Sequence, residues 1–128
     1  MILLLDTSTP TCKVTLVSDD SSHDFSWESG RQLAKGLLEY LEKCLEELGK
    51  TLDDVDMIGV YRGPGSFTGL RIGVTVANTI AESSGIAIVG ETGDDWQNLA
   101  IKRLRQGDND QIVMPIYGSE AHITKQRK

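Results

Sequence analysis

The segment GPGSFTGLRIG, Gly63 to Gly73, constrains the fold of this chain more than any other part of its sequence. Its first seven residues hold three glycines and one proline, and they separate an apolar stretch, Asp56 to Tyr61, from residues at helical spacing, Thr68 to Ser84. The backbone must therefore turn tightly from a buried strand into a helix. Such a turn exposes helix N-terminal amides that can bind an anion, but the lysine that ends a P-loop is missing. The residues leave a structural turn and a ligand or partner loop equally open.

The order of the other elements predicts one α/β unit. Three β-type stretches come first, and the short turn-forming clusters between them predict an antiparallel meander: Ile2 to Thr7, Lys13 to Asp19 and His23 to Ser29. Leucines at helical spacing then predict an amphipathic helix of about four turns that ends at Gly49. A short apolar strand, Ile86 to Val89, follows the second helix, so the later strands pair in parallel with right-handed crossovers. We expect a ribonuclease-H-like fold, the half-unit of the actin-like ATPases, with a mixed five-stranded sheet of three antiparallel and two parallel strands.

The end of the chain predicts a third helix and a last strand. Asp94 with Gln97 three residues on is typical of a capping box at the start of a helix, and Gln111 to Tyr117 is interpreted as a strand. The length of 128 residues suits one core, and no repeat or linker supports a second domain. We therefore expect an actin-like N-terminal lobe, residues 1–92, followed by a short C-terminal helix, strand and tail, residues 93–128.

Charge and cysteine usage exclude several classes of protein. The formal net charge of −6 disfavours independent binding to nucleic acid, and the basic C-terminal run is interpreted as a solvated tail: His122, Lys125, Arg127 and Lys128. The apolar start, Ile2 to Leu5, is too short for a signal peptide or a spanning helix, so we expect a cytoplasmic location and no membrane contact. Cys12 and Cys44 have no CxxC spacing, which predicts reduced thiols packed in the core and no metal site.

Two features could carry chemistry or binding. Asp6, Thr7 and Ser8 end the first strand, where they could meet a metal-bound phosphate or form a turn whose side chains bond the nearby backbone. The second helix carries a ladder of small residues at four-residue spacing: Gly69, Gly73, Ala77 and Ala81. The ladder predicts close approach of another helix, which is either a partner's or the first helix of this chain.

Two motifs resemble the TsaB (YeaZ) family of tRNA threonylcarbamoyladenosine biosynthesis proteins. They are ILLLDTS at Ile2 to Ser8 and GPGSFTGLRIGVTVANTIA at Gly63 to Ala81. The second motif is specific over nearly its whole length, whereas many actin-like proteins share the first. The resemblance covers residues 1 to about 100, and Pro115-Ile116-Tyr117 is similar to the extreme C-terminal end of such proteins.

The resemblance implies a non-catalytic subunit that supports a TsaD-like paralogue in forming N6-threonylcarbamoyladenosine next to the anticodon of tRNA. ATP or ADP and a histidine-held metal are then expected on that partner and none on this chain, whose histidines form no HxxxH motif. A TsaE-like ATPase joins the complex, and tRNA is contacted only indirectly. In the family the partner binds through two helices of the N-terminal lobe, which maps the interface here onto seven residues: Leu33, Leu37, Leu41, Leu70, Gly73, Ala77 and Ile80. On this mapping, a bulky residue at Gly73 or Ala77 should weaken the partner contact and leave the chain folded.

The sequence also departs from the family. Arg31 to Ala34 lacks the His-Ser and the later Pro that often begin the first long helix, and residues 94–128 can supply only a remnant of a second lobe. We expect a short form in which no nucleotide cleft closes within the chain.

Two alternatives remain open from the residues. One is a homodimeric interaction module that uses the same helices. The other is a ribonuclease-H-like nuclease, in which Asp6 and carboxylates of the first helix would hold two metal ions: Glu39, Glu42, Glu46 and Glu47. These glutamates lie opposite the leucine stripe, where a solvated face explains them more simply.

Overall fold

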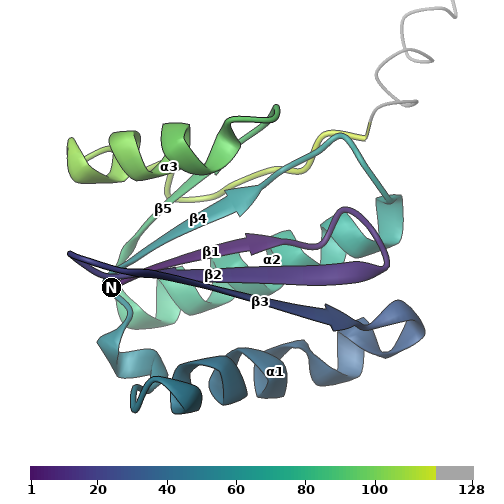
Figure 1. The fold of residues 1–128 in the computed structure, drawn as a ribbon. Coiled ribbons are helices and arrows are strands. Elements are labelled where there is room, and N and C mark those ends of the chain that lie inside the picture. Colours follow the sequence, from purple (N-terminus) through teal and green to yellow (C-terminus); the bar gives the residue numbers. More distant parts are fainter. Residues whose placement is uncertain (118–128) are drawn as a thin grey trace, which may run out of the picture.

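Five strands pair into one mixed sheet, and three α-helices pack on its two faces (Figure 1). The structure is a computed structural model and describes residues 1–117. In chain order the elements are β1 (Ile2–Asp6), β2 (Thr11–Val17), β3 (Ser22–Glu28), α1 (Leu33–Glu47), β4 (Met57–Tyr61), α2 (Phe67–Ser84), β5 (Ala87–Glu91) and α3 (Trp96–Arg105). Short 3-10 turns precede α1 at Gly30–Gln32 and β4 at Leu52–Asp54.

The strand order is β3-β2-β1-β4-β5. The first three strands form the antiparallel meander, and β4 pairs in parallel with both β1 and β5. The register sets Leu3 beside Leu16 on one side and Ile58 on the other, so the middle of the sheet is apolar on the face that α1 and α2 cover. The predicted fold class is confirmed.

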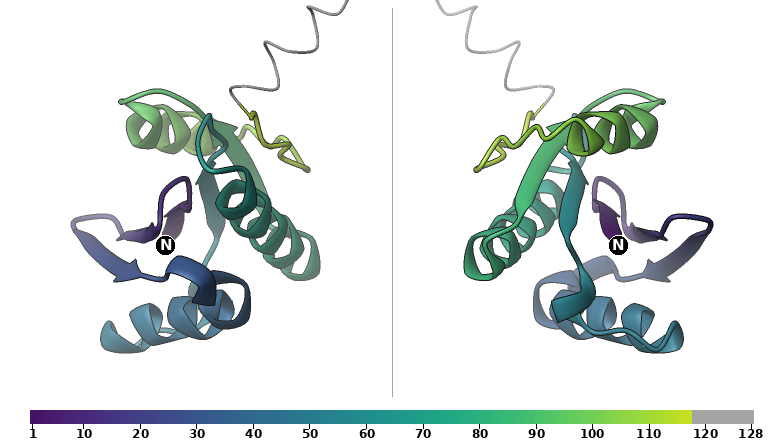
Figure 2. Two further views of the ribbon diagram at one scale, coloured as in Figure 1. Left: turned by 90° about the vertical axis from the view of Figure 1, so that its right-hand side faces the viewer. Right: turned by 90° about the vertical axis from the view of Figure 1, so that its left-hand side faces the viewer.

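Two apolar layers hold the helices on the sheet. The larger one joins α1 and α2 to one face, and both cysteines lie in it with Cys12 and Cys44 buried and free, as predicted. The smaller one lies on the other face, where Trp96, Ala100 and Leu104 of α3 pack against β4 and β5 in one cluster with Ile2 and Leu4 of β1 (Figure 2). The helix that was assigned to a remnant of a second lobe thus shares the sheet of the first. The division at residue 92 stays a prediction.

The start of α3 corrects one expectation. Asp95, and not Asp94, is the N-cap residue, and no side chain caps the helix. The Gln97 amide instead donates to Thr15 Oγ1 on β2, at 3.2 Å. With Asp95 as the N-cap, Gln97 lies only two residues on, and its side chain ties α3 to β2 in place of a cap.

The predicted last strand, Gln111 to Tyr117, is wrong. Residues 109–117 form an extended segment, here called the strap, that lies beyond β5 at the end of the sheet opposite β3 (Figure 2). One backbone bond joins it to β5, from Asp110 N to the Ile88 carbonyl at 2.8 Å, and side chains make the others: Asn109 Oδ1 accepts from Ile88 N at 3.1 Å, and Asp110 Oδ2 accepts from Gly90 N at 2.9 Å. Gln111 has φ +69, a left-handed conformation that interrupts the pleat of a strand.

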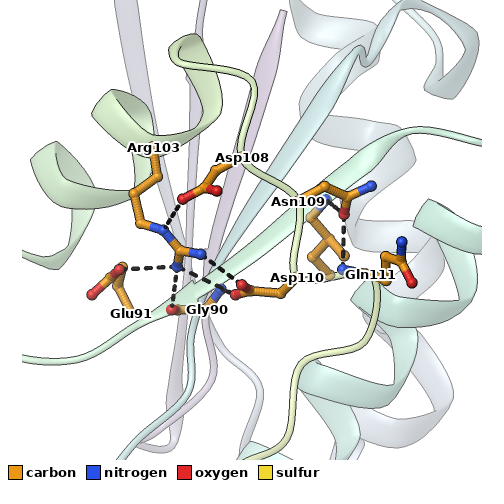
Figure 3. Close-up of polar contacts among 8 residues, drawn as sticks. Gly90, Glu91, Arg103, Asp108, Asn109, Asp110 and Gln111 are labelled. Carbon is orange, nitrogen blue, oxygen red and sulfur yellow. Dashed lines mark hydrogen bonds and ion pairs between the residues drawn. The ribbon is translucent and has the colours of Figure 1, made fainter.

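An arginine of α3 anchors the start of the strap (Figure 3). The Arg103 guanidinium donates from Nε to Asp108 at 2.8 Å, and its two NH groups donate to Asp110 at 2.6 Å and Glu91 at 3.1 Å. The hydrogen bonds that Arg103 donates to Asp110 and Asp108 raise the pKa of its guanidinium above the ordinary value, so they favour the charged form. This group of Arg103 and its three carboxylates is called the latch below.

The rest of the strap is fastened to α2 and to the β4–α2 turn. The Asn78 side chain bonds the backbone of Val113 twice, donating to its carbonyl and accepting from its N–H, both at 2.9 Å. Arg62 Nε donates to the Met114 carbonyl at 2.9 Å, and Ile116 N donates to the Arg62 carbonyl at 2.7 Å. The strap therefore spans from β5 to the first residues of α2.

Candidate functional site

The end of β1 and the turn before α2 form one close-packed junction. Thr7 Oγ1 donates to the Gly69 carbonyl at 2.7 Å, and Ser66 N donates to the Ser8 carbonyl at 2.8 Å. A Cβ on Gly69 would overlap the Thr7 carbonyl oxygen, and one on Gly73 would overlap the Thr7 hydroxyl. The first half of the small-residue ladder therefore brings α2 against the end of β1, not against another helix.

The glycine turn before α2 is also filled from within the chain. Gly63 has φ +114, and a Cβ there would overlap the carbonyl oxygen of Ile116 in the strap. The Tyr61 hydroxyl donates to the Pro64 carbonyl at 3.0 Å, and Ser66 Oγ accepts from Gly69 N at 3.3 Å. Burial raises the pKa of Tyr61, and the carboxylates of Asp6 and Asp94 add to the rise. Of the two functions that were left open for this turn, the described contacts are those of a structural turn.

The Asp6-Thr7-Ser8 triplet is bonded within itself and to α2. Asp6 Oδ1 accepts from Ser8 N at 2.9 Å and from Ser8 Oγ at 2.7 Å, while Thr7 is only 1% exposed. No group of three His, Cys, Asp or Glu side chains that could hold a metal ion occurs within residues 1–117. The Thr7 hydroxyl bonds the backbone and faces the core, whereas Asp6 and Ser8 are half-buried, so the possible contact of the triplet with a phosphate stays a prediction.

The seven residues mapped as a partner interface are buried inside the chain itself. Their exposed fractions do not exceed 7%, and their side chains pack between the helices and the sheet: Leu33, Leu37, Leu41, Leu70, Gly73, Ala77 and Ile80. In the described chain these are core residues, and their use as a partner interface stays a prediction. The leucine stripe and the ladder are the faces that each helix needs for its own sheet, so a partner can only reach the opposite sides of α1 and α2.

The outward side of α2 carries a neutral surface. Between Arg71 and Glu82 the helix has no charged residue. Beside it lies a hollow of about 370 Å³, called the helix groove here, lined by Ala34, Thr68, Arg71, Ile72, Thr75 and Val76. Ile72 and Val76 are half-buried, so their apolar atoms reach the surface. The apolar pattern of α2 already indicates that these residues face something other than the sheet, because the helix is apolar on more sides than its own sheet can cover.

The outward side of α1 is different. Its exposed residues are mostly charged, and Lys43 and Glu39 form an ion pair at 3.9 Å along the helix. The four glutamates of the nuclease hypothesis all lie on this exposed side: Glu39, Glu42, Glu46 and Glu47. Asp6, in contrast, ends β1 and lines a hollow with Trp96 and Asn98 of α3, and the structure does not bring it together with these glutamates in a group of metal ligands among residues 1–117.

The Phe67 ring extends the helix groove toward the strap. Phe67 is 49% exposed, and its ring centroid lies 4.4 Å from that of Tyr117 and 5.8 Å from the Arg71 guanidinium carbon. The neutral side of α2 is therefore bordered at one end by an aromatic pair and a cation.

Among residues 1–117, none of the helices has the length and the apolar character of a membrane span. The predicted basic tail, His122 to Lys128, lies outside the described residues.

Comparisons with known proteins agree on one family. Residues 28–92 match the family model described as TsaD: tRNA N6-adenosine threonylcarbamoyltransferase. The TsaB protein of Escherichia coli K12, a tRNA threonylcarbamoyladenosine biosynthesis protein, is 33% identical over 89 residues, which is 70% of this chain and 38% of that protein. The tRNA N6-adenosine threonylcarbamoyltransferase of Bacillus thuringiensis is 44% identical over 68 residues, 51% of this chain and 20% of that protein.

A solved structure supports the same assignment. YeaZ from Pseudomonas aeruginosa superimposes with a TM-score of 0.68 and 34% identity over 83% of this chain and 49% of that one. The chain thus spans half the length, or less, of these relatives.

Proposed function

Because the chain belongs to the family of the TsaD model and, within it, to the TsaB (YeaZ) proteins, we propose that it is a non-catalytic subunit that binds a TsaD-like paralogue. In this proposal the pair forms N6-threonylcarbamoyladenosine next to the anticodon of tRNA, in the cytoplasm. The pathway in this proposal comes from the names of the relatives, and the proposed binding of a partner comes from the surface of this chain. Binding, not chemistry, is the contribution of the described residues.

The single observation that carries the proposal is the neutral side of α2 with its helix groove. Burying a charged side chain in an interface costs free energy unless a partner compensates it, so the fully covered centre of an interface is depleted in charge. The α2 ridge meets this requirement, and Arg71 and Glu82 lie at its two ends; its surface side chains are Ile72, Thr75, Val76, Asn78 and Thr79. The charged outward side of α1 does not meet it. We therefore place the partner over α2 and the edge of α1 at Ala34.

The cofactors of the reaction belong to the partner in this proposal. The described residues bring no metal-ligand group together, and the only candidate phosphate contact, at Asp6 to Ser8, is closed by its own hydrogen bonds. ATP or ADP and the metal would therefore be held by the TsaD-like protein, with a TsaE-like ATPase as a third component. Contact of this chain with tRNA would be indirect, which suits its net charge of −6.

Co-purification tests the proposal. The full chain is mixed with the TsaD-like protein of its own genome, and both complex formation and threonylcarbamoylation of tRNA are measured with and without the chain. We expect a complex and a modification rate that depends on it. Equal modification in the absence of the chain would show that the proposal is wrong.

A point variant locates the contact. Thr68 is exposed and lines the helix groove, so Thr68→Arg fills the groove without touching the core. We expect it to weaken the complex by about tenfold or more, the equivalent of one lost anchor contact. Asn98→Arg, on the exposed side of α3, is the matched control and should bind normally. Size-exclusion chromatography of the chain alone distinguishes a homodimer through the same surface from a monomer that awaits its partner.

A further inference from the structure

The two ends of the sheet differ in what covers their outer strands. Beside β5, the strap supplies a backbone bond from Asp110 N to the Ile88 carbonyl and further bonds from side chains. Beside β3 no further strand follows among residues 1–117, and β2 is its neighbour in the sheet (Figure 1). The strand contains neither proline nor lysine, which often protect such an edge, and its register with β2 has no bulge. One edge of the sheet is therefore closed, and the other is open.

Hydrogen bonds at both ends of the β2–β3 hairpin show which backbone groups of β3 are free. Ser18 N donates to the Ser21 carbonyl at 2.9 Å, and Ser29 N donates to the Pro10 carbonyl at 3.1 Å. Bonded and non-bonded pairs alternate along an antiparallel ladder, so every second residue of β3 directs its N–H and carbonyl away from β2. Counted from either end, these outward residues are Ser22, Asp24, Ser26 and Glu28. All of them are exposed.

The side chains beside this edge leave it accessible. Asp24 Oδ1 accepts from Thr15 Oγ1 at 2.7 Å, and Glu28 Oε2 accepts from Thr11 Oγ1 at 2.8 Å. Both carboxylates are thus held over β2. On the other face of the strand, Trp27 packs against α1. These contacts draw the side chains toward the chain's own sheet and helix, so an extended backbone can approach the edge.

We propose that the open edge of β3 pairs with the same edge of a second copy of this chain, antiparallel and about a twofold axis at Phe25. This register pairs the whole strand, and outward residues meet outward residues, as a hydrogen-bonded ladder requires. It sets Asp24 opposite Ser26 of the second copy. It also sets Glu28 opposite Ser22 of the second copy. Each carboxylate therefore faces a hydroxyl, and no two like charges lie directly opposite each other.

The two registers next to this one are worse. An axis at Asp24 places that carboxylate against its own copy, and an axis at Ser26 places Asp24 against Glu28. Like charges directly opposite each other destabilise a sheet, and both shifts shorten the ladder. With the axis at Phe25, its ring instead meets the same ring of the second copy in a non-hydrogen-bonded pair, where cross-strand side chains lie closest. Charge complementarity thus favours a second copy in one register.

A twofold pairing of this kind closes on itself. The two five-stranded sheets become one sheet whose outer strands are the two copies of β5, and the strap lies along each. A further copy meets no open edge, so the expected product is a dimer and not a fibre. No residue of β3 lines the helix groove. The inference therefore goes beyond the proposed function and does not depend on a TsaD-like partner.

Sedimentation velocity of the full chain, from about 1 μM to about 500 μM, tests the pairing. We expect a monomer–dimer equilibrium. Ser26→Pro removes an outward N–H and leaves the bonds to β2 intact, so it should weaken the dimer by about tenfold or more. Ser26→Thr keeps the N–H and should not weaken it. Thr68→Arg should not weaken it either, which separates this dimer from one through the helix groove. Urea unfolding confirms that each variant is folded.

Two pairs of variants test the register. Ser26→Lys places a cation opposite Asp24 of the second copy and should strengthen the dimer about threefold, whereas Ser26→Asp should weaken it by a similar factor. Phe25→Cys brings two thiols together at the axis, so mild oxidation should link the dimer through a disulfide. His23→Cys, on the same face, lies opposite Trp27 of the second copy and should not form this link.

A chain that stays monomeric up to about 500 μM would overturn the inference. A dimer that Ser26→Pro leaves unchanged, or that Thr68→Arg abolishes, would overturn it as well, because it would form through another surface. A dimer that Ser26→Lys weakens would show that the axis is not at Phe25. None of these results bears on the proposed function, which the complex with the TsaD-like protein tests separately.

Discussion

The parallel half of the sheet is held at its two ends by opposite means. At the junction, Thr7, Gly69 and Gly73 bring α2 against the end of β1 so closely that no side-chain carbon fits between them. At the latch, Arg103 reaches across to the strap with hydrogen bonds of 2.6 to 3.1 Å to three carboxylates, and its own side chain is 26% exposed. Thr7 in the junction is buried and its contacts depend on shape, whereas the latch is partly exposed to solvent and depends on charge.

The difference teaches which features of a chain can be changed without loss of the fold. A contact that depends on the absence of a Cβ is lost when a side chain is added, because a close-packed interior has no free space for the added atoms. A contact between exposed charges is weakened by water and salt, so its loss costs less and varies with conditions. Substitutions at the two places should therefore differ in size and in their response to salt and pH.

Gly73→Ala should have the largest effect. The new methyl group would overlap Thr7 Oγ1, and the neighbouring Thr7 Cγ2 lies only 2.9 Å away, so either α2 or β1 must shift. We expect a loss of about 3 kcal/mol in the free energy of unfolding, measured by urea denaturation. This corrects the expectation that a bulky residue at Gly73 would spare the fold. Thr7→Ala in the same chain should restore part of the loss; if it restores none, the overlap with Thr7 is not the cause.

Arg103→Ala should have the next largest effect. It removes one cation and leaves Glu91 and Asp110 partly buried without their partner. We expect a loss of about 2 kcal/mol at low salt, the contribution of charge-assisted hydrogen bonds. The gap between variant and unmodified chain should narrow as salt rises from about 0.05 M to about 0.5 M, whereas the loss in Gly73→Ala should not. A gap for Arg103→Ala that is independent of salt would contradict the comparison.

Asn78→Ala should cost less. It removes the two hydrogen bonds that fix Val113, so the backbone N–H and carbonyl of Val113 must bond water instead. We expect a loss of about 1 kcal/mol, with faster amide exchange at Val113 than in the unmodified chain. Thr79→Ala, one residue further along α2, is the control. Unchanged exchange at Val113 in Asn78→Ala would mean that the strap is held without this side chain.

Asp110→Asn should show the smallest effect, and one that depends on pH. Burial of the Asp110 carboxyl opposes its ionisation, but hydrogen bonds from Arg103 and from Gly90 N–H outweigh burial and lower its pKa. A lowered pKa in the folded state means that the carboxylate adds stability above its unfolded pKa of about 3.9, and that this stability is lost as the pH falls through the folded value. The gap in unfolding free energy between the unmodified chain and Asp110→Asn should therefore be constant above about pH 5 and shrink below about pH 4. A gap that widens on acidification would reverse the assignment.

The sequence predicted most of the fold, because the signals were periodic and local. Leucines at helical spacing gave α1, and the glycine turn gave the start of α2 within one residue. The seven residues mapped as an interface lie in the chain's own core, because an apolar stripe shows that a face is covered, but not by what. Leu37 and Leu41 are fully covered by the chain's own sheet, so the partner surface had to be sought in the residues left over, such as Ile72 and Val76.

The strap was beyond the reach of sequence patterns. Gln111 to Tyr117 has the composition of a strand, and only the tertiary contacts of Asn109, Asp110 and Asn78 show that side chains make most of its bonds to β5 and α2. Likewise, no pattern predicts that Arg103 of α3 will bond three carboxylates. Glu91 precedes the helix, and Asp108 and Asp110 follow it. Such long-range polar contacts leave no period in the chain.

The side chains that close the outer edge of β5 have a consequence for polymerisation. A regular strand beside β5 would satisfy one row of backbone groups and present another, so each added strand would be a template for the next. Asn109 and Asp110 accept from Ile88 N and Gly90 N through their side chains, Asp110 N donates to the Ile88 carbonyl, and Asp110 adds a negative charge. Because side chains take two of these bonds and the edge carries a charge, it is a poor template for a strand of a neighbouring molecule.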